Sequence, residues 1–179
     1  MASRCAGRAD DRGDLSGDLA RDIAVDQLYD LVPRIPLDAP TEIATVNILN
    51  SKGGRFVDVT GHSFNGFAFN NVSFQAQAGY PLLQQVMEGH GINESLVHTI
   101  TFPYQAGGDI VVNNLDFFGP TAGIAHPMHV HGKSFFLVGR GPGQIASVED
   151  LAKVQLNTTN PLRRDTIALP FNTWAVLRE

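Results

Sequence analysis

From residue 41 onward, the chain is a series of short apolar segments separated by turn-forming residues. Residues 41–49 and 54–60 alternate apolar and polar side chains, which is typical of half-buried strands, and residues 51–54 between them predict a hairpin turn. Only residues 81–89 have the pattern of a short helix. Strands at this spacing, with almost no helix between them, predict an antiparallel sandwich or barrel. The other strand candidates are residues 64–74, 95–102, 109–118, 126–141, 164–171 and 173–179.

The first 40 residues differ in composition from the rest of the chain. They hold five Arg and eight Asp, and apolar residues recur every three to five positions over residues 15–31, which predicts one amphipathic helix. Three prolines within residues 33–40 then end any helix and indicate a linker. We therefore expect a charged leader and linker over residues 1–40 and a folded domain over residues 41–179.

Charge and cysteine content exclude several kinds of function. The 179 residues carry a formal net charge of -5, and only 17% of them are charged, so nucleic acid is a poor partner for this chain. No segment approaches the roughly 18 apolar residues of a membrane span. The first residues alternate charges where a secretory signal peptide needs an apolar core. Cys5 is the only cysteine, which excludes an intrachain disulfide and a cysteine-based zinc ribbon.

Three of the six histidines, His126, His129 and His131, lie within six residues of one another. In a strand, the last two point to the same face, roughly 6.6 Å apart along the strand axis, and Pro127 keeps His126 extended. Neutral imidazole is a ligand for Cu, Zn, Fe and Ni. A His-x-His pair either chelates one ion or gives one ligand to each of two ions. Three histidines at this spacing on an apolar strand therefore predict a metal site.

Cupins share part of this cluster. In that family, a glycine followed by five residues leads into His-x-His, and Gly123 stands at the matching position before His129. A ligating Glu then follows the second histidine by four or five residues. Phe135 and Phe136 occupy those positions here, and neither can ligate a metal. The cupin pattern therefore loses its third ligand.

Multicopper oxidases match the cluster better. Residues 126–132, His-Pro-Met-His-Val-His-Gly, resemble the His-Pro-x-His-x-His-Gly segment of that family, with laccases and ascorbate oxidases nearest in pattern. Residues 64–74 and 81–86 look like the stretch that opens the last cupredoxin domain of a laccase. Residues 160–166 and 174–178 look like the segment that follows the first copper motif. The resemblance keeps the family's order and covers the chain after the linker.

The resemblance implies a fold, a set of copper ligands and an activity. The fold is an all-β, cupredoxin-like Greek-key sandwich or barrel, the C-terminal domain of the parent enzyme. By the family pattern, His126 ligates the type 1 copper, His129 the type 2 copper and His131 the type 3 pair. The parent enzyme is an oxidoreductase that couples one-electron oxidation of phenols or similar small reductants to the reduction of dioxygen to water.

Several family features are missing from the sequence. The second copper motif, His-Cys-His followed by further histidines, should come after Arg178, so we expect a fragment that is incomplete at the end of this domain and inactive by itself. Cys5, in the leader, is not a plausible substitute for the type 1 thiolate. His62, His90 and His98 are isolated in sequence, and we interpret them as surface or core histidines.

Two other functions stay open from the residues alone. One is a non-enzymatic, single-domain metal-binding protein that uses the three clustered histidines, and the other is a cupin-like enzyme with one metal ion.

The resemblance also implies an extracellular protein, although the sequence shows no signal peptide. Asn71, Asn93 and Asn157 lie in N-glycosylation sequons, which suit a secreted glycoprotein.

Overall fold

The computed structural model describes residues 31–115, 123 and 125–179. The chain divides into two compact units, residues 1–31 and 32–179, and every element named below belongs to the second unit. The leader helix expected from the sequence lies outside the described residues. Among the residues that are described, no helix is long and apolar enough to cross a membrane.

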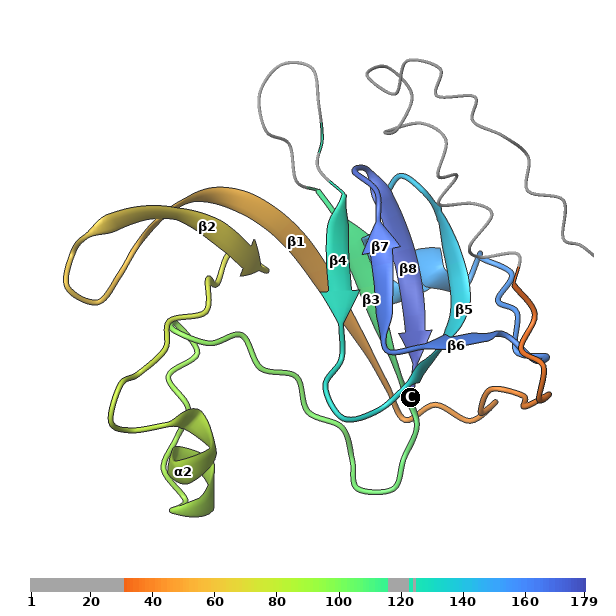
Figure 1. Cartoon of the computed structure of the whole chain (residues 1–179), viewed down its shortest axis with the longest axis horizontal. Helices are drawn as coiled ribbons and strands as arrows, with labels where there is room; N and C mark the ends of the chain where they lie inside the picture. Colours follow the sequence, from red (N-terminus) through yellow and green to blue (C-terminus); the bar gives the residue numbers. More distant parts are fainter. Residues whose placement is uncertain (1–30, 116–122, 124) are drawn as a thin grey trace, which may run out of the picture. The chain divides into compact units, whose positions relative to one another are not determined.

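Strands dominate the second unit. Within its described residues, six strands form one mixed sheet in the order β2-β1-β3-β8-β5-β6, and two more form a separate β4-β7 sheet (Figure 1). β1 and β3 run parallel, and every other neighbouring pair is antiparallel. The strands are β1 (Thr45–Val57), β2 (Ser63–Phe69), β3 (Gly108–Asn114), β4 (His126–His129), β5 (Phe135–Pro142), β6 (Leu162–Arg164), β7 (Thr166–Leu169) and β8 (Thr173–Arg178). The prediction of an all-β fold is confirmed.

The two sheets are joined through buried side chains. The amide of Asn114 in β3 donates a 2.8 Å hydrogen bond to the Leu169 carbonyl in β7, and Asn114 is completely buried. Met128 in β4 and Ile167 in β7 are opposite each other in the small sheet, and both are buried. A buried amide needs a partner, because leaving it unpaired costs about 1–3 kcal/mol. Asn114 therefore fixes the position of β7 on the large sheet.

The first hairpin lies further along the chain than the sequence indicates. β1 continues through residues 51–54, where a turn was expected, because its first half pairs with β3 and its second half pairs with β2. The chain reverses at residues 58–62 instead. Gly61 has a φ of 86°, and the Asp58 carboxylate accepts from the backbone N–H groups of Thr60 and His62. These contacts stabilise the reversal at residues 58–62. The expected turn at residues 51–54 is wrong, because those residues pair with β2.

Residues 126–141 form two strands in different sheets, whereas the sequence predicted one strand. β4 ends at His129, and the chain turns over residues 131–134 before β5 begins. Gly132 has a φ of 80°, which glycine adopts at no steric cost. His131 therefore lies in a turn, and the prediction that it shares a strand face with His129 is wrong.

The centre of the large sheet is the most buried part of the unit. Every residue of β3 is buried, and Val111 in β3 and Val176 in β8 have no exposed surface. At one end of these strands, the Arg178 guanidinium binds the Asp109 carboxylate through two hydrogen bonds of 2.7 and 2.8 Å. A third guanidinium N–H donates to the Pro40 carbonyl. The core cluster contains Ala39, Val111, Val138, Ile145, Leu151, Trp174 and Val176.

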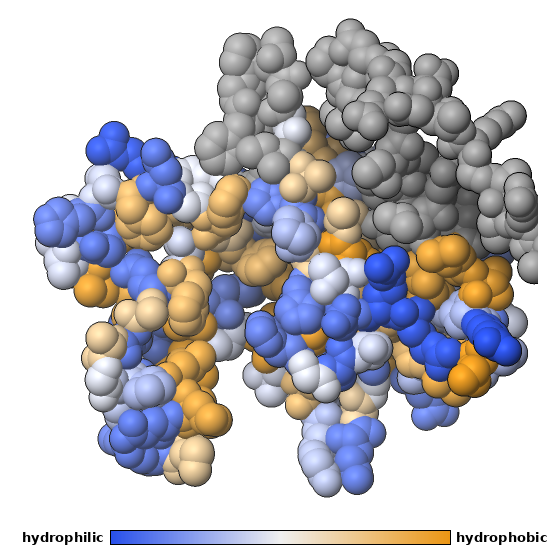
Figure 2. Space-filling view, viewed as in Figure 1, coloured by the Kyte–Doolittle hydropathy of each residue, from blue (hydrophilic) through white to orange (hydrophobic). Residues whose placement is uncertain are grey.

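Helices make a small contribution to the described residues. α2 (Leu82–Met87) confirms the short helix expected over residues 81–89, and it leaves Leu83, Val86 and Met87 exposed (Figure 2). α3 (Val148–Leu151) was not expected from the sequence; its first turn is capped by Ser147, whose hydroxyl accepts from the Asp150 N–H. The strand expected over residues 95–102 is wrong, since that segment pairs with no strand.

Candidate metal site

His126 and His129 point to opposite sides of β4. Side chains alternate along a strand, so residues three apart face opposite sides. Accordingly, His126 is half-buried and Met128 is buried, whereas Pro127 and His129 are exposed. The ring of His126 packs edge-on against Phe67 of β2, with 4.4 Å between the ring centroids. His126 therefore lies on the inner side of the small sheet, and His129 lies on the outer side.

His129 is oriented by β7, the strand that pairs with β4. Its Nδ1 lies 2.8 Å from the Asp165 carbonyl oxygen and 2.8 Å from the hydroxyl oxygen of Thr166. A carbonyl oxygen only accepts hydrogen bonds, so the proton of a neutral ring must be on Nδ1. Nε2 then carries the lone pair that a metal ion requires. In metal sites, the ligating histidine usually donates its other ring N–H to an acceptor such as a backbone carbonyl.

His131 reaches His129 through the turn that follows β4. The two rings are 4.7 Å apart between centroids, with an angle of 66° between their planes. Both side chains are exposed. The structure thus brings His129 and His131 together and leaves His126 on the other side of the strand. Among the described residues, no group of three or more His, Cys, Asp or Glu side chains is close enough to hold one metal ion.

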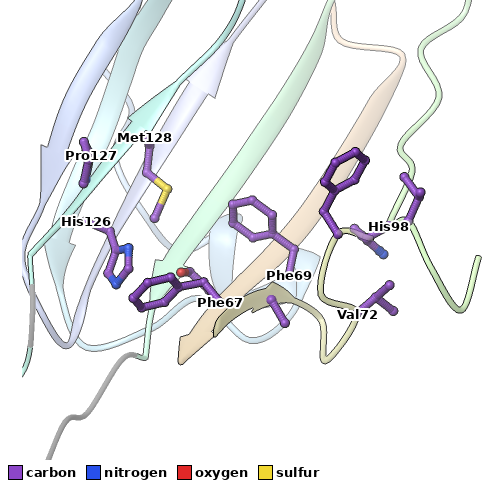
Figure 3. A pocket seen from close by; sticks show the side chains of 11 residues that line it. Phe67, Phe69, Val72, His98, His126, Pro127 and Met128 are labelled. Carbon is purple, nitrogen blue, oxygen red and sulfur yellow. The ribbon is translucent and has the colours of Figure 1, made fainter. Parts of the chain in front are cut away.

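His126 borders an apolar cavity of about 290 Å³ (Figure 3). Aromatic and aliphatic side chains from β2 and from the segment after it form most of the wall. Met128 lies beside His126 on the same strand, and His98 lies across the cavity (Figure 3). The lining residues are Ser51, Phe67, Ala68, Phe69, Val72, Phe74, Val97, His98, His126, Pro127 and Met128. Sequence reasoning identified His126 but did not anticipate this apolar wall, because it comes from residues distant in the sequence.

The other histidines have protein partners of their own. His98 Nε2 is 3.2 Å from the side-chain nitrogen of Asn70, and His62 Nδ1 is 2.8 Å from the Thr60 hydroxyl. His90 stacks edge-on against Tyr80, with 6.0 Å between ring centroids. His62 and His90 are exposed and His98 is half-buried, which agrees with the interpretation of the three as surface or core histidines.

Two carboxylates in other parts of the unit have lowered pKa values. Hydrogen bonds from the Thr60 hydroxyl and the His62 backbone N–H lower the pKa of Asp58. Hydrogen bonds from Gln84 and Tyr80 lower the pKa of Glu88. Asp58 lies in the reversal after β1 and Glu88 caps the C-terminus of α2, so neither belongs to the group of three histidines. The donor set at the end of β4 is therefore made of imidazole, which suits Cu, Zn, Fe and Ni.

The sequence matches known proteins over most of its length. A multicopper oxidase family profile matches residues 69–179. Laccase-1 of Cryptococcus neoformans var. grubii is 41% identical over 153 residues, which are 86% of this chain and 24% of that protein. Laccase-2 of the same organism is 42% identical over 86% of this chain and 25% of its own length. The chain thus spans about a quarter of the length of these curated relatives.

Solved structures show the same fold. A laccase from Botrytis aclada superposes with a TM-score of 0.66 and 23% identity, over 100% of this chain and 29% of that one. Fet3p, a multicopper oxidase that functions in iron import, superposes with a TM-score of 0.63 and 20% identity, over 100% of this chain and 32% of that one. At these identities, the likeness concerns the fold alone, which is that of a cupredoxin-like domain.

Proposed function

The chain belongs to the multicopper oxidase family, a family of oxidoreductases, and we propose from this that it is a copper-binding domain of a laccase-type enzyme. The parent enzyme would oxidise phenols or similar small reductants one electron at a time and reduce dioxygen to water. The observation that carries the proposal is the division of the histidines, with His129 and His131 paired outside β4 and His126 on the inner side. The family match gives no support to the cupin hypothesis.

The division of the histidines agrees with ligands for separate copper ions. On this proposal, His126 would bind a type 1 copper, His129 a type 2 copper and His131 one of a type 3 pair. Imidazole nitrogen suits copper, and Nε2 of His129 carries a lone pair because Nδ1 donates to Asp165. Copper, when bound, supplies the one-electron chemistry that connects oxidation of the reductant to reduction of dioxygen.

The residues around His126 contribute an apolar environment. Phe67 packs on the imidazole ring, and Met128 is buried next to it. An apolar surrounding limits access of water, and it thereby influences the reduction potential of a metal centre. On the outer side of β4, His129 and His131 are exposed and open to further ligands. The two sides of β4 would thus provide ligands to copper centres with different surroundings.

This chain by itself should show neither blue colour nor oxygen turnover. An intense blue copper centre needs a cysteine thiolate beside its histidines. The sequence has one cysteine, Cys5, which stands in the charged leader and far in sequence from the motif. We therefore expect a weak, pale copper site formed by the histidines of the motif.

Copper titration followed by calorimetry and by electron paramagnetic resonance tests the proposal. We expect H129A and H131A to weaken copper binding about 10-fold or more. The control variants H62A and H90A remove histidines outside the motif and should bind copper as the unmodified chain does. Equal losses in the controls would show that copper binds nonspecifically. An intense blue band or uptake of oxygen with a phenol would contradict the expected lack of activity.

The family also supports an extracellular location and glycosylation. Asn71, Asn93 and Asn157 are exposed, so a glycan on any of the three is compatible with the fold. Mass spectrometry before and after enzymatic removal of N-glycans, on protein secreted by a eukaryotic host, would identify the occupied positions. Absence of glycan from all three would contradict this part of the proposal.

A further inference from the structure

The end of β4 is held beside β7 by several contacts around one histidine. His129 is the cross-strand partner of Thr166 in the β4-β7 pair. The Asp165 carbonyl accepts the 3.0 Å hydrogen bond of the Val130 N–H and also lies 2.8 Å from His129 Nδ1. The Thr166 hydroxyl oxygen lies at the same distance from that nitrogen. The backbone of Asp165, just before β7, and the side chain of Thr166, the first residue of β7, thus converge on one imidazole nitrogen.

These contacts restrict the ring more than its exposure suggests. An exposed histidine normally samples several rotamers and both neutral tautomers. Here, rotation of the ring would break the contacts to Asp165 and Thr166 together. Moving the proton to Nε2 would place the lone pair of Nδ1 against a carbonyl oxygen, which repels it. The ring is therefore held with Nδ1 inward and Nε2 directed away from β7.

We propose that Thr166 is a positioning residue, which together with the Asp165 carbonyl presets His129 for binding copper through Nε2. This inference rests on the proposed function, because it assigns a role to Thr166 at the same site. Thr166 touches no metal ion; it acts through His129. Residues that orient a metal-ligating histidine typically contribute about 10- to 100-fold in metal affinity. We expect an effect in that range from loss of the hydroxyl.

Two substitutions separate the hydroxyl from the packing of Thr166. T166V keeps the branched shape and removes the hydroxyl, whereas T166S keeps the hydroxyl and removes the methyl group. T60V is a matched control, because the Thr60 hydroxyl lies 2.8 Å from Nδ1 of His62, a histidine outside the motif. Circular dichroism establishes that each variant is folded before binding is measured.

The first readout uses the metal-free chain. Long-range proton–nitrogen correlation spectra report which ring nitrogen of His129 carries the proton. We expect Nδ1–H in the unmodified chain and in T166S, where the hydroxyl oxygen is a second acceptor for this N–H. In T166V the Nδ1–H keeps only the Asp165 carbonyl, which the Val130 N–H already shares, so we expect a larger share of Nε2–H. The same tautomer distribution in T166V and the unmodified chain would overturn the proposal, as would a predominant Nε2–H form in the unmodified chain.

The second readout is the dissociation constant for copper. We expect it to rise about 10- to 100-fold in T166V and to return towards the original value in T166S, with no change in T60V. Unchanged affinity in T166V would overturn the proposal. If the unmodified chain does not bind copper, the proposed function fails. A changed tautomer distribution in T166V would still support the positioning role of Thr166 in that case.

Discussion

The centre of the large sheet and the end of β4 differ in almost every physical respect. β3 buries all seven of its residues, whereas β4 buries only Met128 among its four. At one end of the central strands β3 and β8, a charged pair, Asp109 and Arg178, is 1% and 5% exposed. At the end of β4, the polar side chains His129 and His131 face solvent. The residues of the central strands and the two exposed histidines therefore belong to separate parts of the molecule.

Substitutions in the two regions should therefore have different effects. In the sheet centre, a changed side chain alters packing or leaves a buried charge unpaired, so stability falls. At the end of β4, a changed side chain loses a ligand but disturbs little packing. The comparison therefore predicts that stability and copper binding respond to different residues.

Breaking the buried ion pair should have the largest effect on stability. D109A leaves the Arg178 guanidinium buried without its bidentate partner. Removing one member of a buried pair costs about 3–5 kcal/mol, and urea unfolding measures the loss. The control is K153A, which breaks the exposed Lys153–Asp150 pair; such pairs contribute about 0–1 kcal/mol. Equal losses for D109A and K153A would contradict the contrast between the sheet centre and the surface.

A smaller effect should follow from adding one methyl group beside Trp174. A Cβ on Gly141 would lie 2.7 Å from the nearest Trp174 ring carbon, and the buried ring cannot move freely. Overpacking of this kind costs about 1–3 kcal/mol, so G141A should unfold at lower urea than the unmodified chain. G54A is the control, since its Cβ would meet its nearest neighbour at 3.6 Å. Similar urea midpoints for G141A and G54A would show that the Trp174 ring moves aside at little cost.

The histidine pair should show the reverse behaviour. H129A and H131A remove exposed rings, and exposed substitutions usually change stability by less than about 0.5 kcal/mol. We expect urea midpoints close to that of the unmodified chain, together with weakened copper binding. If either variant loses folding while copper binding is unchanged, that histidine is a core residue and not a ligand.

Sequence patterns predicted the strand content because alternation and turn residues are local signals. They misplaced the first hairpin, since residues 51–54 have turn composition but pair with β2 in the structure. The actual reversal depends on hydrogen bonds to Asp58, and residues 52–57 extend β1 by pairing with β2, since β3 pairs with β1 only as far as Ser51. The placement of the turn was thus decided by the pairing of β1 with β2, which turn composition does not encode.

The sequence singled out the three histidines of the candidate site but did not predict how they are arranged. The spacing of His129 and His131 predicted neighbouring rings through strand alternation, whereas the turn at Gly132 brings them together. The contacts of His129 with Asp165 and Thr166 come from the register of β4 and β7. No local pattern encodes that register, so these partners could be identified only from the structure.

The smallest expected effect concerns pH and the turn at residues 58–62. Hydrogen bonds from Thr60 and His62 lower the pKa of Asp58 in the folded chain, so the folded state favours the ionised carboxylate. The stabilisation is therefore present above the carboxyl pKa of the unfolded chain, about 4, and is lost as the pH falls through the lower folded value. D58N removes the charge at every pH. Its midpoint in urea should fall slightly below that of the unmodified chain at pH 7, and the difference should shrink as the pH drops below about 4. A difference that stays constant over this range would show that the Asp58 charge does not stabilise the turn.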